Sequence, residues 1–291
     1  MRILVASDGS AGAAAAVDAA IRFPWPDASR ARGVVALGRV GWAGSTELRA
    51  AIVRSLHASA DETRSMLRKR WPQADVVELH QAAADAICSE AARFRAGAIV
   101  LGWRGHGTFA RLLAGSVSRA VAERAGCSVL IVRDGARVRG ALARRFAVGF
   151  DGSRNSRNAI RFIARLQPPR GNRVVLVSVL EPLHMPPVSR VTAQIRAHIQ
   201  EAIARQSAER LRQAGRRLQR AAEELRRRGW HVTTRAQTGA PLQGLLAEAG
   251  RSSAQVLVVG ARGATGLERL LLGSVASGAL NRSPLPVVIA R

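Results

Sequence analysis

Residues 102–117 read GWRGHGTFARLLAGSV, and residues 260–275 read GARGATGLERLLLGSV. Nine of the sixteen aligned positions are identical, and the alignment has no gap. Each stretch directly follows a short apolar run, 98–101 or 256–259, of the kind that forms a buried strand. Similarity of this kind at equivalent places indicates two copies of one structural module in the chain.

A second repeat lies at the start of each half. Residues 3–10 (ILVASDGS) match residues 146–153 (FAVGFDGS), so that in both halves an apolar strand ends in Asp-Gly-Ser and leads into a helical segment. Further strands are expected at 34–37, 76–79, 129–132, 174–179, 231–234 and 286–289. Strands that alternate with helices indicate a parallel sheet with helices on both faces.

The expected fold is therefore α/β. We predict two tandem doubly wound modules, residues 1–138 and 144–291, each with a five-stranded parallel sheet of order 3-2-1-4-5. The apolar fraction of 47% is sufficient for packed cores.

The chain is strongly basic, with 45 basic and 20 acidic residues and a formal net charge of +25. Such a surface attracts nucleotides, polyphosphate, nucleic acid and anionic lipid. Lys69 is the only lysine, so a codon bias toward arginine is a second interpretation of the charge. No run of 18 apolar residues and no signal-peptide pattern is present, so we expect a cytoplasmic protein without a membrane span.

The two long matches share the spacing Gly-x2-Gly-x9-Gly-Ser. Where glycines follow a strand, the missing Cβ atoms let backbone N–H groups approach an anion, and the final Gly-Ser opens a helix whose N-terminus attracts phosphate. We therefore expect nucleotide contacts in the first half from Gly102, Arg104, Gly105, Gly115, Ser116 and Val117, and in the second from Gly260, Arg262, Gly263, Gly273, Ser274 and Val275. The alternative is that the glycines only allow a tight turn between strand and helix.

The aspartates of the first repeat fit the same crevice. Asp8 with Gly9, and Asp151 with Gly152, end the first strand of each half. In a sheet of this order, strands 1 and 4 flank the switch point where ligands bind. A carboxylate repels polyphosphate, so each aspartate is expected at the base or sugar end of the nucleotide.

Other kinds of site are not supported. The chain has no P-loop, no G-x-G-x-x-G at a helix start, no G-x-S-x-G and no H-E-x-x-H, and Cys88 and Cys127 match no zinc spacing. We expect neither a catalytic residue nor a metal site. Because no general base lies beside the expected phosphates, slow ATP hydrolysis stays only an alternative.

At these residues the chain resembles the universal stress protein family, the UspA-like proteins, in their tandem two-domain form. The resemblance implies ATP as the ligand, with or without Mg²⁺, and places the aspartate near the adenine. It also implies that Val179, at the end of the second strand of the second half, lines the base. The matching residue in the first half is Arg39, and Trp103 stands where the second half has Ala261. We therefore expect the second site to bind better.

The resemblance further implies that last strands pair, with 129–132 beside 287–290, so that the two halves form an intramolecular pseudo-dimer; a homodimer stays open. It implies a nucleotide-dependent role in stress response or signalling without strong catalysis. The other alternative is a protein that binds nucleic acid or another polyanion, because arginine crowds the expected long helix of 189–228.

Overall fold

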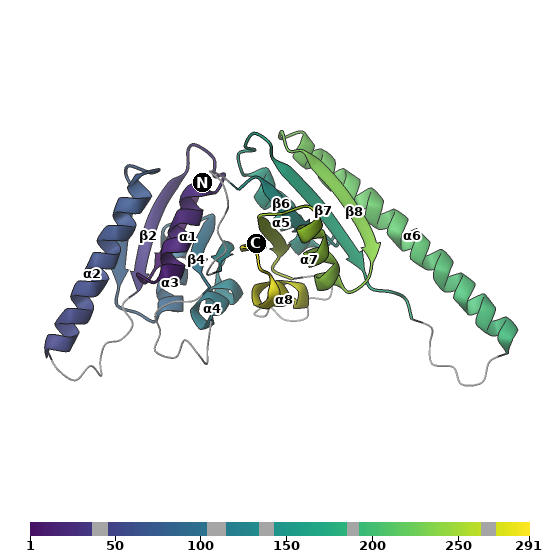
Figure 1. The fold of residues 1–291 in the computed structure, drawn as a ribbon, viewed down its shortest axis with the longest axis horizontal. Coiled ribbons are helices and arrows are strands. Elements are labelled where there is room, and N and C mark those ends of the chain that lie inside the picture. Colours follow the sequence, from purple (N-terminus) through teal and green to yellow (C-terminus); the bar gives the residue numbers. More distant parts are fainter. Residues whose placement is uncertain (37–45, 104–114, 134–142, 185–191, 263–271) are drawn as a thin grey trace.

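The computed structural model describes residues 1–36, 46–103, 115–133, 143–184, 192–262 and 272–291, and the chain folds into two halves that lie side by side (Figure 1). The first half contains β1 (Arg2–Ser7), α1 (Ala11–Arg22), β2 (Arg30–Ala36), α2 (Thr46–Arg68), β3 (Asp75–Leu79), α3 (Ala83–Arg93), β4 (Ala98–Gly102), α4 (Ser116–Arg124) and β5 (Ser128–Val132). The second half contains β6 (Arg145–Gly149), α5 (Arg154–Ala164), β7 (Arg173–Leu180), α6 (Ala193–Arg226), β8 (Val232–Thr238), α7 (Pro241–Arg251), β9 (Val256–Gly260), α8 (Ser274–Arg282) and β10 (Val287–Ala290).

The strands of each half form a parallel sheet in the expected order. In the first half the order is β3-β2-β1-β4-β5, and in the second it is β8-β7-β6-β9-β10. Both are the order 3-2-1-4-5. The predicted fold class, two doubly wound α/β modules, is thus confirmed.

The last strands of the two halves join the sheets. Strands β5 and β10 pair antiparallel, with Leu130 opposite Val288 at the centre of the pairing. Ten strands therefore form one continuous sheet, and neither of these two strands is left with an open edge. The strand pairing that the family resemblance implied is present in the structure.

Helices cover both faces of this sheet because side chains alternate along buried strands. Ile3 and Val5 of β1 contribute to one apolar cluster, which contains residues of α1, α2, α5 and α6. Leu4 contributes to the other cluster, which contains residues of α3, α4, α7 and α8. A strand that is buried on both faces explains the near-continuous apolar runs in the sequence.

An aromatic cluster connects the two halves on the first of these faces. Phe23, after α1, lies 5.9 Å from Phe146 of β6 between ring centroids, and Trp25 lies 6.3 Å from Phe162 of α5. Trp230, before β8, meets Phe146 edge-on at 5.5 Å. Side chains of the first half are therefore part of the core of the second.

Helix α6 has 34 residues and is about 50 Å long. It runs beside β8 and extends past it at its N-terminal end (Figure 1). Leu218 and Leu225 are fully buried, whereas Ile195 near its start is 50% exposed. The long helix expected at 189–228 is confirmed over Ala193–Arg226, with Thr192 as its N-cap, and residues 189–191 lie outside the described residues. None of the helices described is both long and apolar enough to cross a membrane.

Candidate functional site

The turn after the first strand of the second half has a defined local geometry. The carboxylate of Asp151 accepts a hydrogen bond from the backbone N–H of Ser153 at 2.8 Å, and Gly152 has a left-handed φ of +82°. The hydroxyl of Ser153 accepts the backbone N–H of Ser156 at 3.1 Å and caps α5. The first half repeats these features at Asp8, Gly9 and Ser10. Asp-Gly-Ser therefore has a structural role as turn and helix cap in both halves.

The first glycine of each long match lies against the helix that follows this turn. A Cβ on Gly260 would come within 2.5 Å of the carbonyl oxygen of Asn155 and 2.8 Å of the amide nitrogen of Ser156. A Cβ on Gly102 would come within 2.7 Å of the carbonyl oxygen of Gly12 in α1. These contacts bring the glycine motif and the Asp-Gly-Ser turn together at the carboxyl ends of strands 1 and 4 of each half. They also show that packing alone requires these two glycines.

The serines of the motif begin α4 and α8. Ser116 and Ser274 are both exposed, Val117 is 37% exposed and Val275 is half-buried. Each helix follows a glycine N-cap, and within the part of the chain that the structure describes no side chain caps either N-terminus. An uncapped helix N-terminus offers amide groups and a positive dipole end to an anion.

The two N-caps differ in conformation. Gly115 is left-handed, with φ +87°, whereas Gly273 is extended, with φ −63° and ψ 160°. The indole of Trp103 lies against Gly115, because a Cβ there would be 2.8 Å from two of its ring carbons. The guanidinium of Arg133 lies over the same ring at 5.1 Å from the centroid. Ala261 occupies the equivalent position in the second half, where its carbonyl accepts the backbone N–H of Gly273 at 2.9 Å, so no indole stands at that position.

A cavity of about 200 Å³ lies beside the carboxylate of the second half. Asp151 and Gly152 line it together with Arg210 and Arg217 of α6. The Cδ of Arg217 is 3.3 Å from the position of a Cβ on Gly152, and the guanidinium of Arg210 donates to the carbonyl of Glu181 at 3.2 Å. Sequence reasoning missed both arginines. Their seven-residue spacing, which puts them on one face of α6, is the signal that identifies them.

Val179 does not share this cavity. Its side chain points toward α7, where a Cβ on Gly244 would lie 2.9 Å from it. The neighbouring residue, Ser178, is 4% exposed and lines the cavity beside Asp151. Alternation along β7 places the two side chains on opposite faces of the sheet. The structure therefore does not bring Val179 and Asp151 together in one cavity.

Arg262 is half-buried just after β9. Burial, with a smaller contribution from the positive charge of Arg262, lowers the pKa of Arg291 at the end of the chain. Arg262 therefore lies where its charge acts on the contact between the halves. Three further residues expected at the sites, Arg104, Gly105 and Gly263, lie outside the described residues.

A family model described as the universal stress protein family matches residues 1–133 and 143–291. The chain belongs to the universal stress protein family. The two matched segments coincide with the two halves of the sheet, so the chain is a tandem two-domain member of that family.

Relatives and solved structures agree with this assignment. Universal stress proteins of Mycobacterium tuberculosis and Mycobacterium bovis are each 32% identical over 204 residues, which is 66% of this chain and 61% of the relatives' length. The match therefore spans less than two thirds of those relatives. A universal stress protein from Archaeoglobus fulgidus is 17% identical, with 100% of this chain and 96% of that chain covered and a TM-score of 0.65. This likeness shows the fold.

A universal stress protein solved in complex with cAMP is also similar. It is 25% identical, with 46% of this chain and 96% of that chain covered, and the TM-score is 0.35. The bound cyclic nucleotide is a property of that protein.

Proposed function

We propose that this universal stress protein binds ATP, with or without Mg²⁺, at the switch point of its second half. The observation that carries the proposal is the contact of Gly260 with the first turn of α5. Through that contact the Asp151 turn and the glycine motif meet at the carboxyl ends of β6 and β9, where doubly wound sheets bind ligands. Asp151 would face the base or ribose, and Gly273 and Ser274 would hold phosphate at the N-terminus of α8.

The charge around this crevice supports an anionic ligand. Arg210 and Arg217 line the cavity beside Asp151, and Arg262 follows β9. Guanidinium groups suit phosphate because they offer several donors in a fixed plane. Val275, the second residue of α8, would contact the ligand from the helix start, and Val179 would contact the base only from the α7 side of the sheet.

The first half carries the same elements in a weaker form. Asp8 with Gly9, and Ser116 with Val117, stand where their counterparts stand in the second half. Trp103, however, packs on the N-cap of α4. We therefore assign the first half a weaker affinity for nucleotide.

In this proposal the protein acts as a nucleotide-dependent stress-response or signalling protein without strong catalysis, in the cytoplasm. The domains run over 1–138 and 144–291. Because β5 and β10 already pair within one chain, the halves act as a pseudo-dimer, and a homodimer is not required.

Calorimetric titration of the full chain with ATP, with and without Mg²⁺, tests the proposal. Gly273→Leu is the informative variant, because the extended backbone of Gly273 accepts a side chain without strain. We expect it to abolish binding at the second half while the melting temperature stays near that of the parent. Absence of heat and of a thermal shift at millimolar ATP in the parent protein would refute the proposal. cAMP, titrated in the same way, establishes which adenine nucleotide is preferred.

Phosphate release under the same conditions tests the alternative of slow hydrolysis. Turnover that follows the protein through purification and disappears in Gly273→Leu would establish an ATPase. We expect no turnover above that of this variant.

A further inference from the structure

A second concave surface lies at the opposite edge of the second half, at the amino ends of β6, β7 and β8. It is a groove of about 700 Å³. Arg145 and Arg173, at the starts of β6 and β7, and Arg226, at the end of α6, contribute to its wall. Its volume is in the range of small-molecule sites. Because the candidate nucleotide site lies at the carboxyl ends of the strands, the groove is a separate place in the fold.

The groove is positively charged and has no acidic counterpart. None of the residues described along it is an aspartate or a glutamate. Arg145 donates its Nε–H to the carbonyl of Ser253 at 2.7 Å, and Arg226 donates to the carbonyl of Val232 at 2.8 Å. Carbonyl acceptors hold a guanidinium in place without neutralising it, so the groove keeps its charge.

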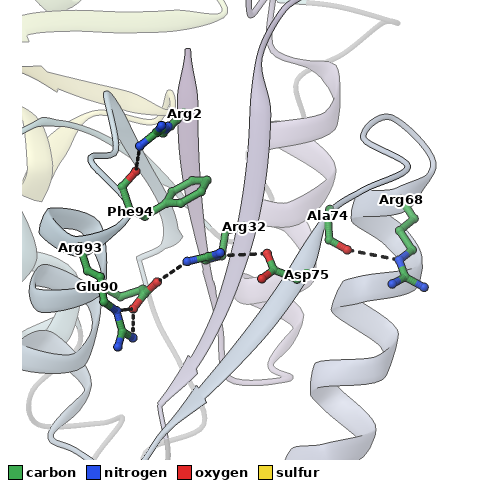
Figure 2. Close-up of polar contacts among 8 residues, drawn as sticks. All are labelled: Arg2, Arg32, Arg68, Ala74, Asp75, Glu90, Arg93 and Phe94. Atoms are coloured by element: carbon green, nitrogen blue, oxygen red, sulfur yellow. Dashed lines mark hydrogen bonds and ion pairs between the residues drawn. The ribbon is translucent and has the colours of Figure 1, made fainter.

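The same edge of the first half has an ion-pair network around one further arginine (Figure 2). There Arg32 of β2 lies between Asp75 of β3, at 3.1 Å, and the fully buried Glu90 of α3, at 2.9 Å. Strand pairing gives the equivalent residues in the second half, which are Val175 for Arg32 and Thr233 for Asp75. Thr233 lines the groove. At this edge the second half therefore lacks both the arginine and the aspartate of this network, and it keeps Arg145 and Arg173 where the first half has Arg2 and Arg30.

The groove also contains a buried donor without an acceptor. Trp230 is 2% exposed and lines the groove, and its indole N–H has no hydrogen-bond partner among the described residues. Asn172 fixes this tryptophan from both sides, since it donates to the carbonyl of Gly229 at 3.2 Å and accepts the backbone N–H of His231 at 2.8 Å. Native proteins rarely leave a buried donor unpaired, so a ligand acceptor is a natural partner for it.

We propose that this groove binds a small organic anion with an apolar body. The anionic group lies between Arg145 and Arg173, an acceptor atom takes the indole N–H of Trp230, and the body packs against Phe146 and Val232, which also line the groove. Guanidinium groups supply the charge, and the apolar residues of the wall select against inorganic anions.

The test is a fluorescence titration of the full chain with two probes that share one apolar body. These are 8-anilinonaphthalene-1-sulfonate, which is anionic, and N-phenyl-1-naphthylamine, which is neutral. Arg173→Gln is the informative variant, and Arg30→Gln is its matched control, because Arg30 holds the equivalent place in the first half. We expect Arg173→Gln to weaken binding of the sulfonate by about tenfold, and Arg30→Gln to leave it within about twofold.

Two further measurements identify the site. Trp230→Phe, which removes the N–H and keeps an aromatic ring, is expected to weaken sulfonate binding by about threefold. Saturating ATP is expected to leave the sulfonate bound. Equal losses in Arg173→Gln and Arg30→Gln, displacement of the probe by ATP, or equally tight binding of the neutral probe would each overturn the proposal. Should Trp230→Phe fail to fold, the two arginine variants decide the question.

Discussion

Exchanging one residue between the two halves should exchange their ability to hold nucleotide. Trp103 packs on the N-cap of α4, whereas the small side chain of Ala261 stands at the equivalent place in the second half. Trp103→Ala should therefore raise the number of tightly bound ATP molecules per chain from one to two. Ala261→Trp should lower it from one to none, and the double variant should bind one again, in the first half.

The structure sets the size of the stability changes that accompany this exchange. The side chain of Trp103 is almost entirely buried, so Trp103→Ala should cost about 3–5 kcal/mol of unfolding free energy. About 0.5–1 kcal/mol of this belongs to the contact with Arg133. Ala261 is equally buried, and overpacking there should cost about 1–3 kcal/mol. Each site that ATP fills at a hundredfold excess over its Kd adds about 2.7 kcal/mol to the unfolding free energy.

Calorimetry below room temperature gives the stoichiometry, and thermal melting with and without ATP gives the stabilisation by nucleotide. The parent should show one increment of stabilisation, Trp103→Ala two and Ala261→Trp none. A single site in Trp103→Ala, with the variant folded by circular dichroism, would show that the indole is not what weakens the first site. Unchanged ATP binding in Ala261→Trp would show that the nucleotide does not approach α8.

Three further predictions concern stability and reactivity. Glu90→Gln leaves Arg32 and Arg93 without their buried carboxylate and should lower the unfolding free energy by about 2–3 kcal/mol. The loss is smaller than for a fully buried pair because both arginines keep some contact with solvent. A loss below about 1 kcal/mol in urea unfolding would contradict the pairing. Burial, with a smaller contribution from Cys88, raises the pKa of the Cys127 thiol to about 11. Because burial remains in a Cys88→Ser background, the reaction of Cys127 with a disulfide reagent should be slow there at pH 8 and rise about tenfold per pH unit above it; a rate like that of free cysteine at pH 8 would refute this. Gly260→Ala should destabilise by about 1–3 kcal/mol through its clash with α5, whereas Gly250→Ala, with open space around it, should stabilise its helix by about 0.5–1 kcal/mol.

The sequence predicted the architecture well because its two repeats fix both the number of strands and their connections. Boundaries were less accurate where side chains are polar. β8 was expected at 231–234 and runs over Val232–Thr238, since its second half is mostly exposed and lacks apolar residues. β2 begins at Arg30 rather than at residue 34, because its first residues are arginines, alanine and glycine. Both strands have a polar end, where apolar periodicity gives no signal.

The candidate site was predicted only in part. Motif spacing located Asp151 and Gly260, but the packing of Gly260 against α5 depends on tertiary contact and gives the glycine a second role. The approach of Arg217 to Gly152, and of Trp103 to Gly115, joins residues far apart in the chain. No local sequence pattern predicts such contacts, although comparison of the two repeats identified Trp103 as the residue that replaces Ala261.

The net charge had two interpretations, attraction of anionic ligands and a codon bias toward arginine. The structure separates the arginines into those that pair with acids and those that do not. On α6, Arg205 pairs with Glu201, and Arg212 and Arg216 pair with Glu209. These exposed pairs are typical of a solvated helix face. The arginines that line the groove at the amino ends of β6 and β7 have no such partner among the described residues. Any selective role of the charge therefore belongs to the arginines that line the groove and the cavity beside Asp151, and not to the paired arginines of α6.

Two arginines in equivalent positions connect each half to the helix that follows the glycine motif of the other half, α8 or α4. Arg133, directly after β5, donates to the carbonyls of Leu280 and Asn281 at the end of α8, at 2.6 and 2.8 Å. Arg291, directly after β10, donates to the carbonyls of Ala122 and Glu123 at the end of α4. Each helix has nine residues, about 13 Å from end to end. A ligand at the N-terminus of α8 would therefore act on a short helix whose other end is held by the first half, through the same Arg133 that lies over Trp103. A shift of α8 along its axis would therefore reach Arg133 and, through it, the indole that packs on the N-cap of α4.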